Sequence, residues 1–176
     1  MEEKKNLRDF TYKELLAEVS RLGEKPYRAE QLYAWIFRRY AVSIDEMTDI
    51  SKPLRERLKE GYCIRPDAVV EVLEAPDGTR KFLTELADGN RIESVLIPES
   101  GRLTLCVSSQ AGCALSCRFC MTAEGGLMRN LTLAELAGQV FSARTLFKEG
   151  EKITNIVLMG MGEPLANYDN VLRFIG

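Results

Sequence analysis

The residues of this chain best suited to chemistry are three cysteines within one octapeptide. Cys113, Cys117 and Cys120 follow the spacing C-x3-C-x2-C, and the 176-residue chain contains no histidine. Three thiolates can each hold one iron of a cubane iron–sulfur cluster, whose full set of thiolate ligands is four. The fourth iron would then be open to a small molecule. The spacing therefore predicts a [4Fe–4S] cluster with one open coordination position.

Two other interpretations of the octapeptide stay open at this point. The cysteines could be buried in a core, although a loop that follows Gly112 does not favour this. A structural zinc ion could bind there, but it needs four ligands. The candidate for the fourth is Cys106, seven residues before Cys113 and expected inside a strand. A zinc site would make the chain a non-catalytic RNA-binding module.

A second motif is the segment Met159-Gly160-Met161-Gly162-Glu163-Pro164. Glycine lets the backbone approach a bound molecule closely, and a carboxylate accepts hydrogen bonds from an ammonium group. Gly-Glu-Pro turns are common, so the motif gains weight from its position one strand after the cysteine loop. Ligands bind at the carboxyl ends of parallel strands, where both motifs are expected.

The elements that must position these motifs begin with a helical region over residues 7–62. Thr11-x-x-Glu14 is a capping-box pattern, followed by apolar residues at helical spacing and a stop at Gly23. Further helices are expected over residues 28–39 and after Ser51, where Pro53 is an early helical proline.

Residues 68–98 change to strand patterning. Turns with Asp77-Gly78 and Asp88-Gly89 separate three β-rich runs, and Asp-Gly between such runs is a strong hairpin signal. The pattern predicts an antiparallel meander of three strands. The expected strands are Ala68–Leu73, Lys81–Leu86 and Arg91–Ile97.

The remaining sequence predicts a βαβ unit with a parallel strand pair. The strands are Leu103–Ser108 and Asn155–Met159, apolar on both faces, and Thr132-x-x-Glu135 caps a helix expected to run to about Lys148. The fold class is therefore α/β: a helical accessory region at 1–66, the antiparallel meander at 67–100, and a βαβ portion at 101–176. Two parallel strands cannot close a barrel, so the chain is expected to be the N-terminal part of something longer.

Composition excludes several other classes of protein. The chain is 45% hydrophobic and 28% charged, which is ordinary for a globular protein. A net charge of −2 argues against nucleic-acid binding over the whole surface, so any RNA contact must be local. The N-terminus lacks the apolar segment of a signal peptide, and no apolar run reaches the roughly 18–20 residues of a membrane span. Cysteines without a signal peptide indicate reduced thiols and a cytoplasmic location.

Four wider stretches carry a resemblance to one family. Together they resemble the RlmN family of radical S-adenosylmethionine (SAM) enzymes, the adenine-C2 methyltransferases of large-subunit (23S) rRNA. The adenine-C8 methyltransferase Cfr shares the barrel motifs, but the N-terminal helical region is more similar to RlmN. The stretches are Arg28-Ala29-Glu30-Gln31-Leu32-Tyr33-Ala34-Trp35-Ile36, Asp45-Glu46-Met47-Thr48, Leu105-Cys106-Val107-Ser108-Ser109-Gln110-Ala111-Gly112-Cys113 and Asn155-Ile156-Val157-Leu158-Met159-Gly160-Met161-Gly162-Glu163-Pro164-Leu165.

The resemblance implies a role for each matching residue. The three loop cysteines would ligate the cluster, Phe119 would occupy the aromatic position before the last cysteine, and Gly162 with Glu163 would receive the amino group of SAM. Cys106 would be the cysteine that resolves a protein–RNA crosslink through a disulfide, and Glu93 the proton acceptor. From the residues alone, Cys106 is a buried strand cysteine and Glu93 an exposed strand carboxylate. Cys63 matches no functional position.

The resemblance also implies a route and its partners. One SAM methylates a cysteine, and a second SAM is cleaved reductively on the cluster to a 5′-deoxyadenosyl radical. That radical takes a hydrogen from the methylcysteine, and the resulting methylcysteine carbon radical adds to the adenine. The resemblance further implies that residues 101–176 are the start of a partial (β/α) barrel. The methyl-carrying cysteine has no counterpart in this chain, so the chain alone is not expected to complete the reaction. The implied partners are 23S rRNA, with tRNA as a second candidate, and an electron donor such as flavodoxin. A monomer is expected.

The segment Lys25–Tyr40 interleaves cations with aromatic side chains. Cations neutralise phosphates and aromatic rings stack on unpaired bases, which suits RNA with an accessible, flipped or loop adenine. The alternative is an amphipathic helix with a solvated charged face and a core side that contains Trp35 and Ile36. The residues concerned are Lys25, Arg28, Arg38 and Arg39 with Tyr27, Tyr33, Trp35, Phe37 and Tyr40.

Overall fold

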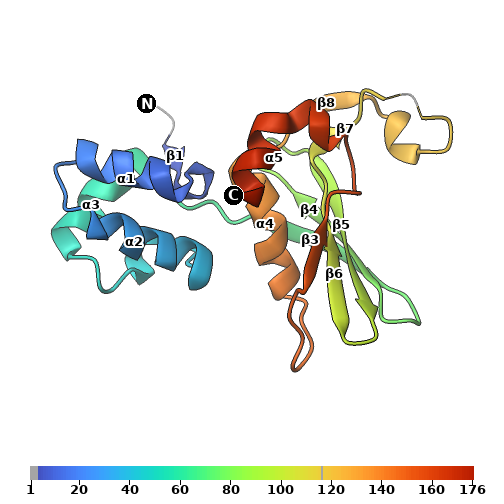
Figure 1. The fold of residues 1–176 in the computed structure, drawn as a ribbon, viewed down its shortest axis with the longest axis horizontal. Helices are drawn as coiled ribbons and strands as arrows, with labels where there is room; N and C mark the ends of the chain where they lie inside the picture. Colours follow the sequence, from blue (N-terminus) through green and yellow to red (C-terminus); the bar gives the residue numbers. More distant parts are fainter. Residues whose placement is uncertain (1–3, 116) are drawn as a thin grey trace. The chain divides into compact units, whose positions relative to one another are not determined.

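The computed structural model describes residues 4–115 and 117–176 and divides them between two compact units, Met1–Pro66 and Asp67–Gly176 (Figure 1). Outside the described residues lie residues 1–3 and Ser116. Residues 1–3 belong to the N-terminus that lacks a signal-peptide pattern, and Ser116 belongs to the cysteine octapeptide. Each unit has its own hydrophobic core, and the two are described separately below.

The first unit is helical, as the sequence predicts. At its first helix, Thr11 and Glu14 form a complete capping box: the Glu14 carboxylate accepts from the Thr11 backbone N–H at 2.8 Å, and Thr11 Oγ1 accepts from Glu14 N–H at 3.4 Å. Leu15, Leu32 and Leu58 bring the three α-helices to one core. The elements are β1 (Lys5–Asn6), η1 (Leu7–Asp9), α1 (Tyr12–Arg21), α2 (Tyr27–Tyr33), the π-helical η2 (Ala34–Arg38), η3 (Ile44–Glu46), α3 (Lys52–Gly61) and β2 (Tyr62–Cys63).

Two details of this unit differ from the expected helices. The helix over residues 28–39 changes to π-helical hydrogen bonding, in which Arg39 N–H donates to the Ala34 carbonyl at 2.8 Å. Ser51 occupies the N-cap of α3, but its side chain makes no capping hydrogen bond. The third helix therefore begins after Ser51 as expected, with Pro53 in its first turn.

The second unit contains one five-stranded sheet in the order β3-β4-β5-β6-β9. The predicted meander and the predicted parallel pair are both present, and they are joined because β5 pairs with β6 antiparallel, with Val95 opposite Cys106. The boundary expected near residue 100 thus falls within one sheet. The strands are β3 (Ala68–Glu74), β4 (Arg80–Glu85), β5 (Arg91–Glu99), β6 (Arg102–Cys106) and β9 (Asn155–Val157).

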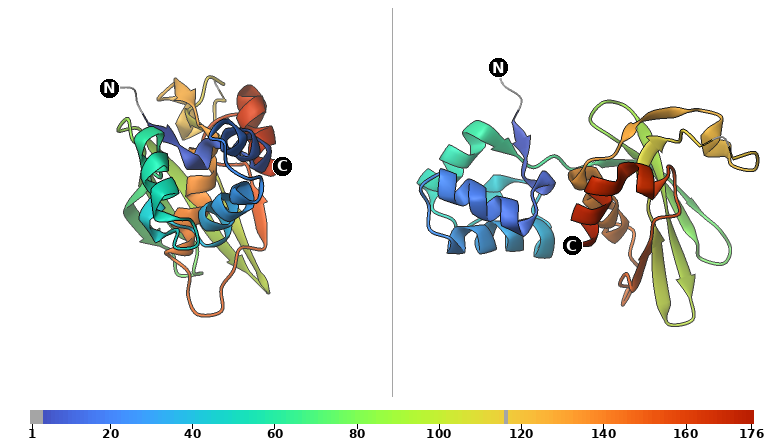
Figure 2. Two further views of the ribbon diagram at one scale, coloured as in Figure 1. Left: turned by 90° about the vertical axis from the view of Figure 1, so that its left-hand side faces the viewer. Right: turned by 45° about the horizontal axis from the view of Figure 1, so that its top comes forward.

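The two faces of the sheet differ. Phe82, Leu96 and Leu105 alternate along their strands with more exposed residues and pack toward α4 (Leu133–Arg144) and α5 (Tyr168–Ile175), which lie on the same side of the sheet (Figures 1 and 2). Glu93 and Cys106 belong to the opposite face, because Cys106 pairs with Val95 and alternate residues share a face. The two residues expected to act in chemistry therefore lie on the face away from these helices.

Three elements correct the predicted boundaries. α4 ends at Arg144, not near Lys148; β6 ends at Cys106, not at Ser108; and β9 ends at Val157, not at Met159. Within the described residues β9 lies at the edge of the sheet, and its Ile156 is 43% exposed. A second hairpin was not predicted: β7 (Gln110–Gly112) pairs with β8 (Leu127–Asn130), and the short helices η4 (Met121–Ala123) and η5 (Pro164–Asn167) accompany it.

No helix within residues 4–115 and 117–176 is long and apolar enough to cross a membrane.

Candidate functional site

The cysteine loop is the connection of the β7–β8 hairpin. Its neck is closed by a hydrogen bond from Cys113 N–H to the Gly126 carbonyl at 3.0 Å. Gly112, one residue earlier, has φ +78°, and a Cβ placed there would lie 1.9 Å from that same carbonyl oxygen. The neck therefore needs glycine at position 112 both for backbone conformation and for close approach.

The three thiols differ in exposure within this loop. Cys113 is buried at the neck, Cys120 is half-buried, and Cys117 is exposed, with a turn between the last two in which Cys120 N–H donates to the Cys117 carbonyl at 3.1 Å. Within the described part of the chain, no three cysteine or carboxylate side chains converge closely enough to hold a metal ion. The structure thus places the thiols on one closed loop without bringing their sulfurs together.

The donor chemistry of the loop nevertheless fits an iron–sulfur cluster. All three donors are thiols on a short segment, and the Leu115 N–H donates to Cys113 Sγ at 3.4 Å. Hydrogen bonds to sulfur are one of the means by which a protein tunes such a cluster. Phe119, predicted to be a cofactor-binding residue, is 92% exposed beside Cys120.

The segment 159–163 is held tightly against the end of β6. Gly160 N–H donates to the Val107 carbonyl at 3.1 Å, and Met161 N–H donates to Ser108 Oγ at 2.9 Å. A Cβ at position 160 would lie 2.8 Å from the Ser108 backbone nitrogen. Glycine is therefore required at this position by backbone packing, which is a reason that the motif alone does not reveal.

Glu163 lies at the turn between this segment and η5. Its carboxylate accepts a hydrogen bond from Leu165 N–H at 3.0 Å and so caps η5, and its own N–H donates to Gln110 Oε1 at 2.9 Å. One carboxylate oxygen is engaged by the cap. The side chain is half-buried at the carboxyl end of the parallel pair, where an ammonium group could be received.

Cys106 and Glu93 lie on the same sheet face. Burial raises the pKa of the Cys106 thiol, and a hydrogen bond from the Met159 backbone opposes this shift. Glu93 forms an ion pair with Lys81 at 2.9 Å and borders a small pocket of about 130 Å³. The Glu93 backbone also contacts the segment that follows β6, since the Glu93 carbonyl accepts a hydrogen bond from Ser108 Oγ at 2.6 Å.

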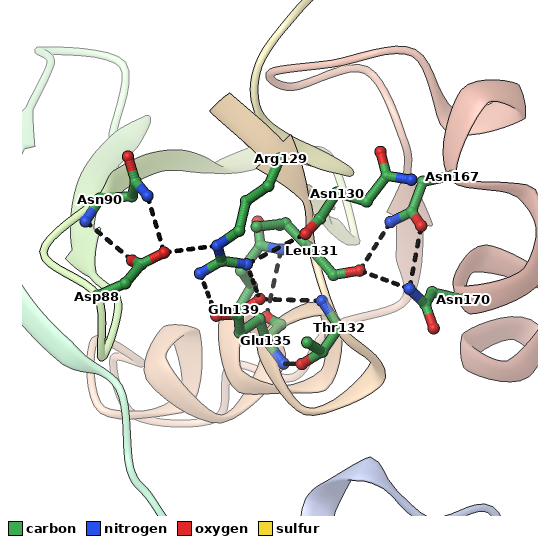
Figure 3. A network of polar contacts seen from close by, with 10 residues as sticks. All are labelled: Asp88, Asn90, Arg129, Asn130, Leu131, Thr132, Glu135, Gln139, Asn167 and Asn170. Carbon is green, nitrogen blue, oxygen red and sulfur yellow. Dashed lines mark hydrogen bonds and ion pairs between the residues drawn. The ribbon is translucent and has the colours of Figure 1, made fainter. Parts of the chain in front are cut away.

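A polar network that sequence reasoning missed surrounds the hairpin (Figure 3). Arg129 on β8 donates two hydrogen bonds to the Glu135 carboxylate, both at 2.7 Å, and a further one to Asp88 at 2.5 Å. The Arg129 guanidinium holds the pKa of Asp88 well below its usual range. Since Glu135 completes the capping box of α4 with Thr132, Arg129 joins the hairpin to the start of α4 and to the β4–β5 turn.

A second missed residue is Gln139, fully buried on α4. Its Oε1 accepts from Ser108 N–H at 2.7 Å and from Ser94 Oγ at 2.8 Å, and its Nε2 donates to the Ser108 carbonyl at 2.9 Å. A glutamine in an apolar helix was the available sequence signal, because buried amides are normally fully hydrogen-bonded.

In the first unit, Arg28, Arg38 and Arg39, three of the cations predicted to contact RNA, already have partners. The Arg39 guanidinium lies 4.4 Å from the Trp35 ring centroid and pairs with Asp49 at 3.5 Å, and Trp35 Nε1 donates to the same carboxylate at 2.5 Å. Arg38 pairs with Glu30 at 2.7 Å. Any RNA contact here would compete with these internal pairs.

Comparison with known proteins agrees with the geometry. The family model described as "Ribosomal RNA large subunit methyltransferase N-terminal domain" matches residues 5–64. The dual-specificity RNA methyltransferase RlmN of Desulfosudis oleivorans is 56% identical over 147 residues, which cover 84% of this chain and 40% of that protein. The RlmN of Halorhodospira halophila is 54% identical over 158 residues, covering 90% of this chain and 44% of that protein.

A solved structure extends the similarity to three dimensions. The crystal structure of a radical SAM methyltransferase from Sphaerobacter thermophilus superposes with a TM-score of 0.87 and 42% identity, over 97% of this chain and 51% of that one. The chain spans 40 to 50% of the length of the curated relatives that it matches. On the similarity of sequence and fold together, this chain belongs to the RlmN methyltransferase family.

Proposed function

We propose that this chain contributes the cluster-binding and SAM-binding elements of an RNA methyltransferase that acts on C2 of an adenine in 23S rRNA, with tRNA as a further substrate. The observation that carries the proposal is the direct connection between two motifs at the carboxyl end of β6 and β9. The cysteine hairpin and the Gly160–Glu163 segment are joined there by the hydrogen bond between Gln110 and Glu163. Ligands of α/β folds bind at this end of parallel strands.

In this proposal Cys113, Cys117 and Cys120 hold a [4Fe–4S] cluster. When bound, the cluster would supply an electron for cleaving SAM at its open iron, and so provide radical chemistry. Such chemistry suits the C2 position of adenine, which has no acidic proton and is a poor nucleophile. Glu163 would accept hydrogen bonds from the SAM amino group, with Gly162 giving that group access to the backbone, and Phe119 would line the cofactor side of the loop.

Two residues of the opposite sheet face would handle thiol and proton chemistry. The Cys106 thiol, kept protonated by burial, would be the resolving cysteine, and Glu93 would accept a proton from the substrate. RNA would approach the cationic and aromatic segment Lys25–Tyr40. A reduced flavodoxin as electron donor, a monomeric state and a cytoplasmic location complete the proposal.

Anaerobic reconstitution with iron and sulfide tests the central step. The protein should turn brown with broad absorbance near about 400 nm, as iron–sulfur proteins do, and Cys117→Ala should lose its iron. The matched control is Cys106→Ala, which should keep full iron content because Cys106 has no ligand role. Full iron in Cys117→Ala would overturn the three-cysteine assignment. A colourless, zinc-containing protein that loses its metal in Cys106→Ala would support the zinc-stabilised RNA-binding module instead.

A further inference from the structure

Gln110 is the first residue of the cysteine hairpin, and its side chain is 1% exposed. Its Oε1 accepts from the Glu163 backbone N–H at 2.9 Å, and its Nε2 donates to Asn130 Oδ1 at 2.7 Å. Because a backbone N–H can only donate, the amide oxygen must face Glu163 and the amide nitrogen must face Asn130. The orientation of this buried amide is thus fixed by its partners.

Asn130 continues the chain of bonds on the returning strand of the hairpin. With its Oδ1 directed at Gln110, its Nδ2 donates to the Ala166 carbonyl at 3.3 Å, within η5. The two amides therefore link both strands of the hairpin to the segment that contains Glu163. Each bond has one possible direction, so the same two amides hold the hairpin neck and the backbone of Glu163.

Packing reinforces this link without spare room. Gly162 has φ +92°, and a Cβ at that position would lie 2.5 Å from Gln110 Cβ. The Gln110 backbone N–H also donates to the Met161 carbonyl at 3.2 Å. Gln110 therefore contacts the segment through its backbone, its aliphatic carbons and its amide.

We infer that Gln110 is a positioning residue that couples the cysteine hairpin to Glu163, with Asn130 as its partner. The inference rests on the proposed function, because the hairpin is assigned to the cluster and Glu163 to the amino group of SAM. For one SAM molecule to be held at both places, the carboxylate of Glu163 and the open iron would have to lie at a suitable position relative to each other. Gln110 would set that relative position through the backbone of Glu163, without contacting the carboxylate or the iron.

The first test uses cofactor-free protein and amide hydrogen exchange. Gln110→Met keeps the side-chain volume and removes both amide bonds, so the Glu163 amide loses its acceptor and should exchange about 2- to 12-fold faster. Gln139→Met is the matched control: it also removes a buried amide from the end of β6, but no hydrogen bond joins Gln139 to residues 160–163 in the described structure. Equal exchange at Glu163 in wild type and Gln110→Met would overturn the inference.

The second test uses the reconstituted protein and two readouts, SAM affinity from anaerobic calorimetry and the change in the electron paramagnetic resonance spectrum of the reduced cluster on adding SAM. Gln110→Met should keep its iron, bind SAM about tenfold more weakly and show a smaller spectral change. Gln139→Met should match wild type per iron. Gln110→Met with full iron and wild-type SAM affinity would overturn the inference.

A conservative variant covers the case in which Gln110→Met does not fold. Gln110→Glu keeps an acceptor for Glu163 N–H but loses the donor to Asn130, so its SAM affinity should lie between wild type and a tenfold loss. Wild-type affinity and spectrum in Gln110→Glu would then count against the coupling. Wild type that takes up no iron, or shows no response to SAM, would instead refute the proposed function.

Discussion

Replacing Gly112 by alanine should open the neck of the cysteine hairpin. Gly112 has φ +78°, and its added Cβ would lie 1.9 Å from the carbonyl oxygen of Gly126. That oxygen accepts the neck hydrogen bond from Cys113 N–H at 3.0 Å, so the two strands must separate and the bond must break. The change should leave the main sheet intact, because β7 and β8 form a separate two-stranded sheet.

The magnitude follows from two costs. An L-residue in the left-handed region costs about 1–2 kcal/mol, and the lost hydrogen bond costs about 0.5–1.5 kcal/mol. The sum is about 1.5–3.5 kcal/mol, and since each 1.4 kcal/mol is tenfold, the neck should open about 10- to 300-fold more often. Gly126→Ala is the matched control, because Gly126 has φ +67° but nothing within 4 Å of its Cβ. This variant carries the conformational cost alone.

Two measurements on metal-free protein report the opening. Exchange of the Cys113 amide should accelerate in Gly112→Ala by more than in Gly126→Ala, and alkylation of the buried Cys113 thiol should accelerate in the same order. The thermal unfolding midpoint of the protein should change little, because the main sheet stays intact. Equal effects of the two alanine variants on Cys113 would refute the reasoning, since the contact between the Cβ at position 112 and the Gly126 carbonyl oxygen would then carry no cost.

Three further predictions concern buried or paired groups. Arg129 lowers the pKa of Asp88, so this ion pair stabilises the fold above the unfolded carboxyl pKa of about 3.9, and the stabilisation is lost as pH falls. The difference in stability between wild type and Asp88→Asn should therefore shrink on acidification. A constant difference from pH 7 to pH 2 would contradict this. Burial raises the Cys106 pKa, so its alkylation rate should still be rising where an ordinary thiol, with a pKa of about 8.5, is already ionised; a plateau near pH 9 would show otherwise. Arg80→Met should lower the free energy of unfolding, measured by urea titration, by about 1–3 kcal/mol. The reason is that Arg80 is 3% exposed and both of its terminal nitrogens form hydrogen bonds, one of them to Glu151. An unchanged stability would mean that the cost of burying the charge balances these bonds.

Much of the secondary structure was predictable because its signals are local. The capping boxes at Thr11 and Thr132 start helices where the pattern indicates, and the Asp-Gly turns join the antiparallel strands as expected. These signals involve residues three or four apart, so their energies are set before any tertiary contact forms. The parallel pairing of β6 and β9 followed from the βαβ order.

Elements whose partners are distant in sequence were missed. The β7–β8 hairpin joins Gln110–Gly112 to Leu127–Asn130 across a long loop, and strands of three and four residues carry too little alternation to be recognised. The end of β9 was placed too late because its apolar run continues to Met159, whereas its pairing with β6 ends at Val157. In each case the pairing partner, not the local sequence, decides the structure.

The sequence by itself determined which donors are available and in what order: three thiols at C-x3-C-x2-C spacing, then a glycine–carboxylate turn one crossover later. The sequence is sufficient to predict these donors, because it specifies both the type of each ligand and the number of residues between ligands. Only the tertiary structure decided that Gly162 packs on Gln110, that Gln110 accepts from Glu163, and that Cys106 lies on the sheet face away from α4. The contacts of Gln110 join residues about fifty positions apart, and buried amides find their partners only when packing excludes water and requires each donor to be satisfied.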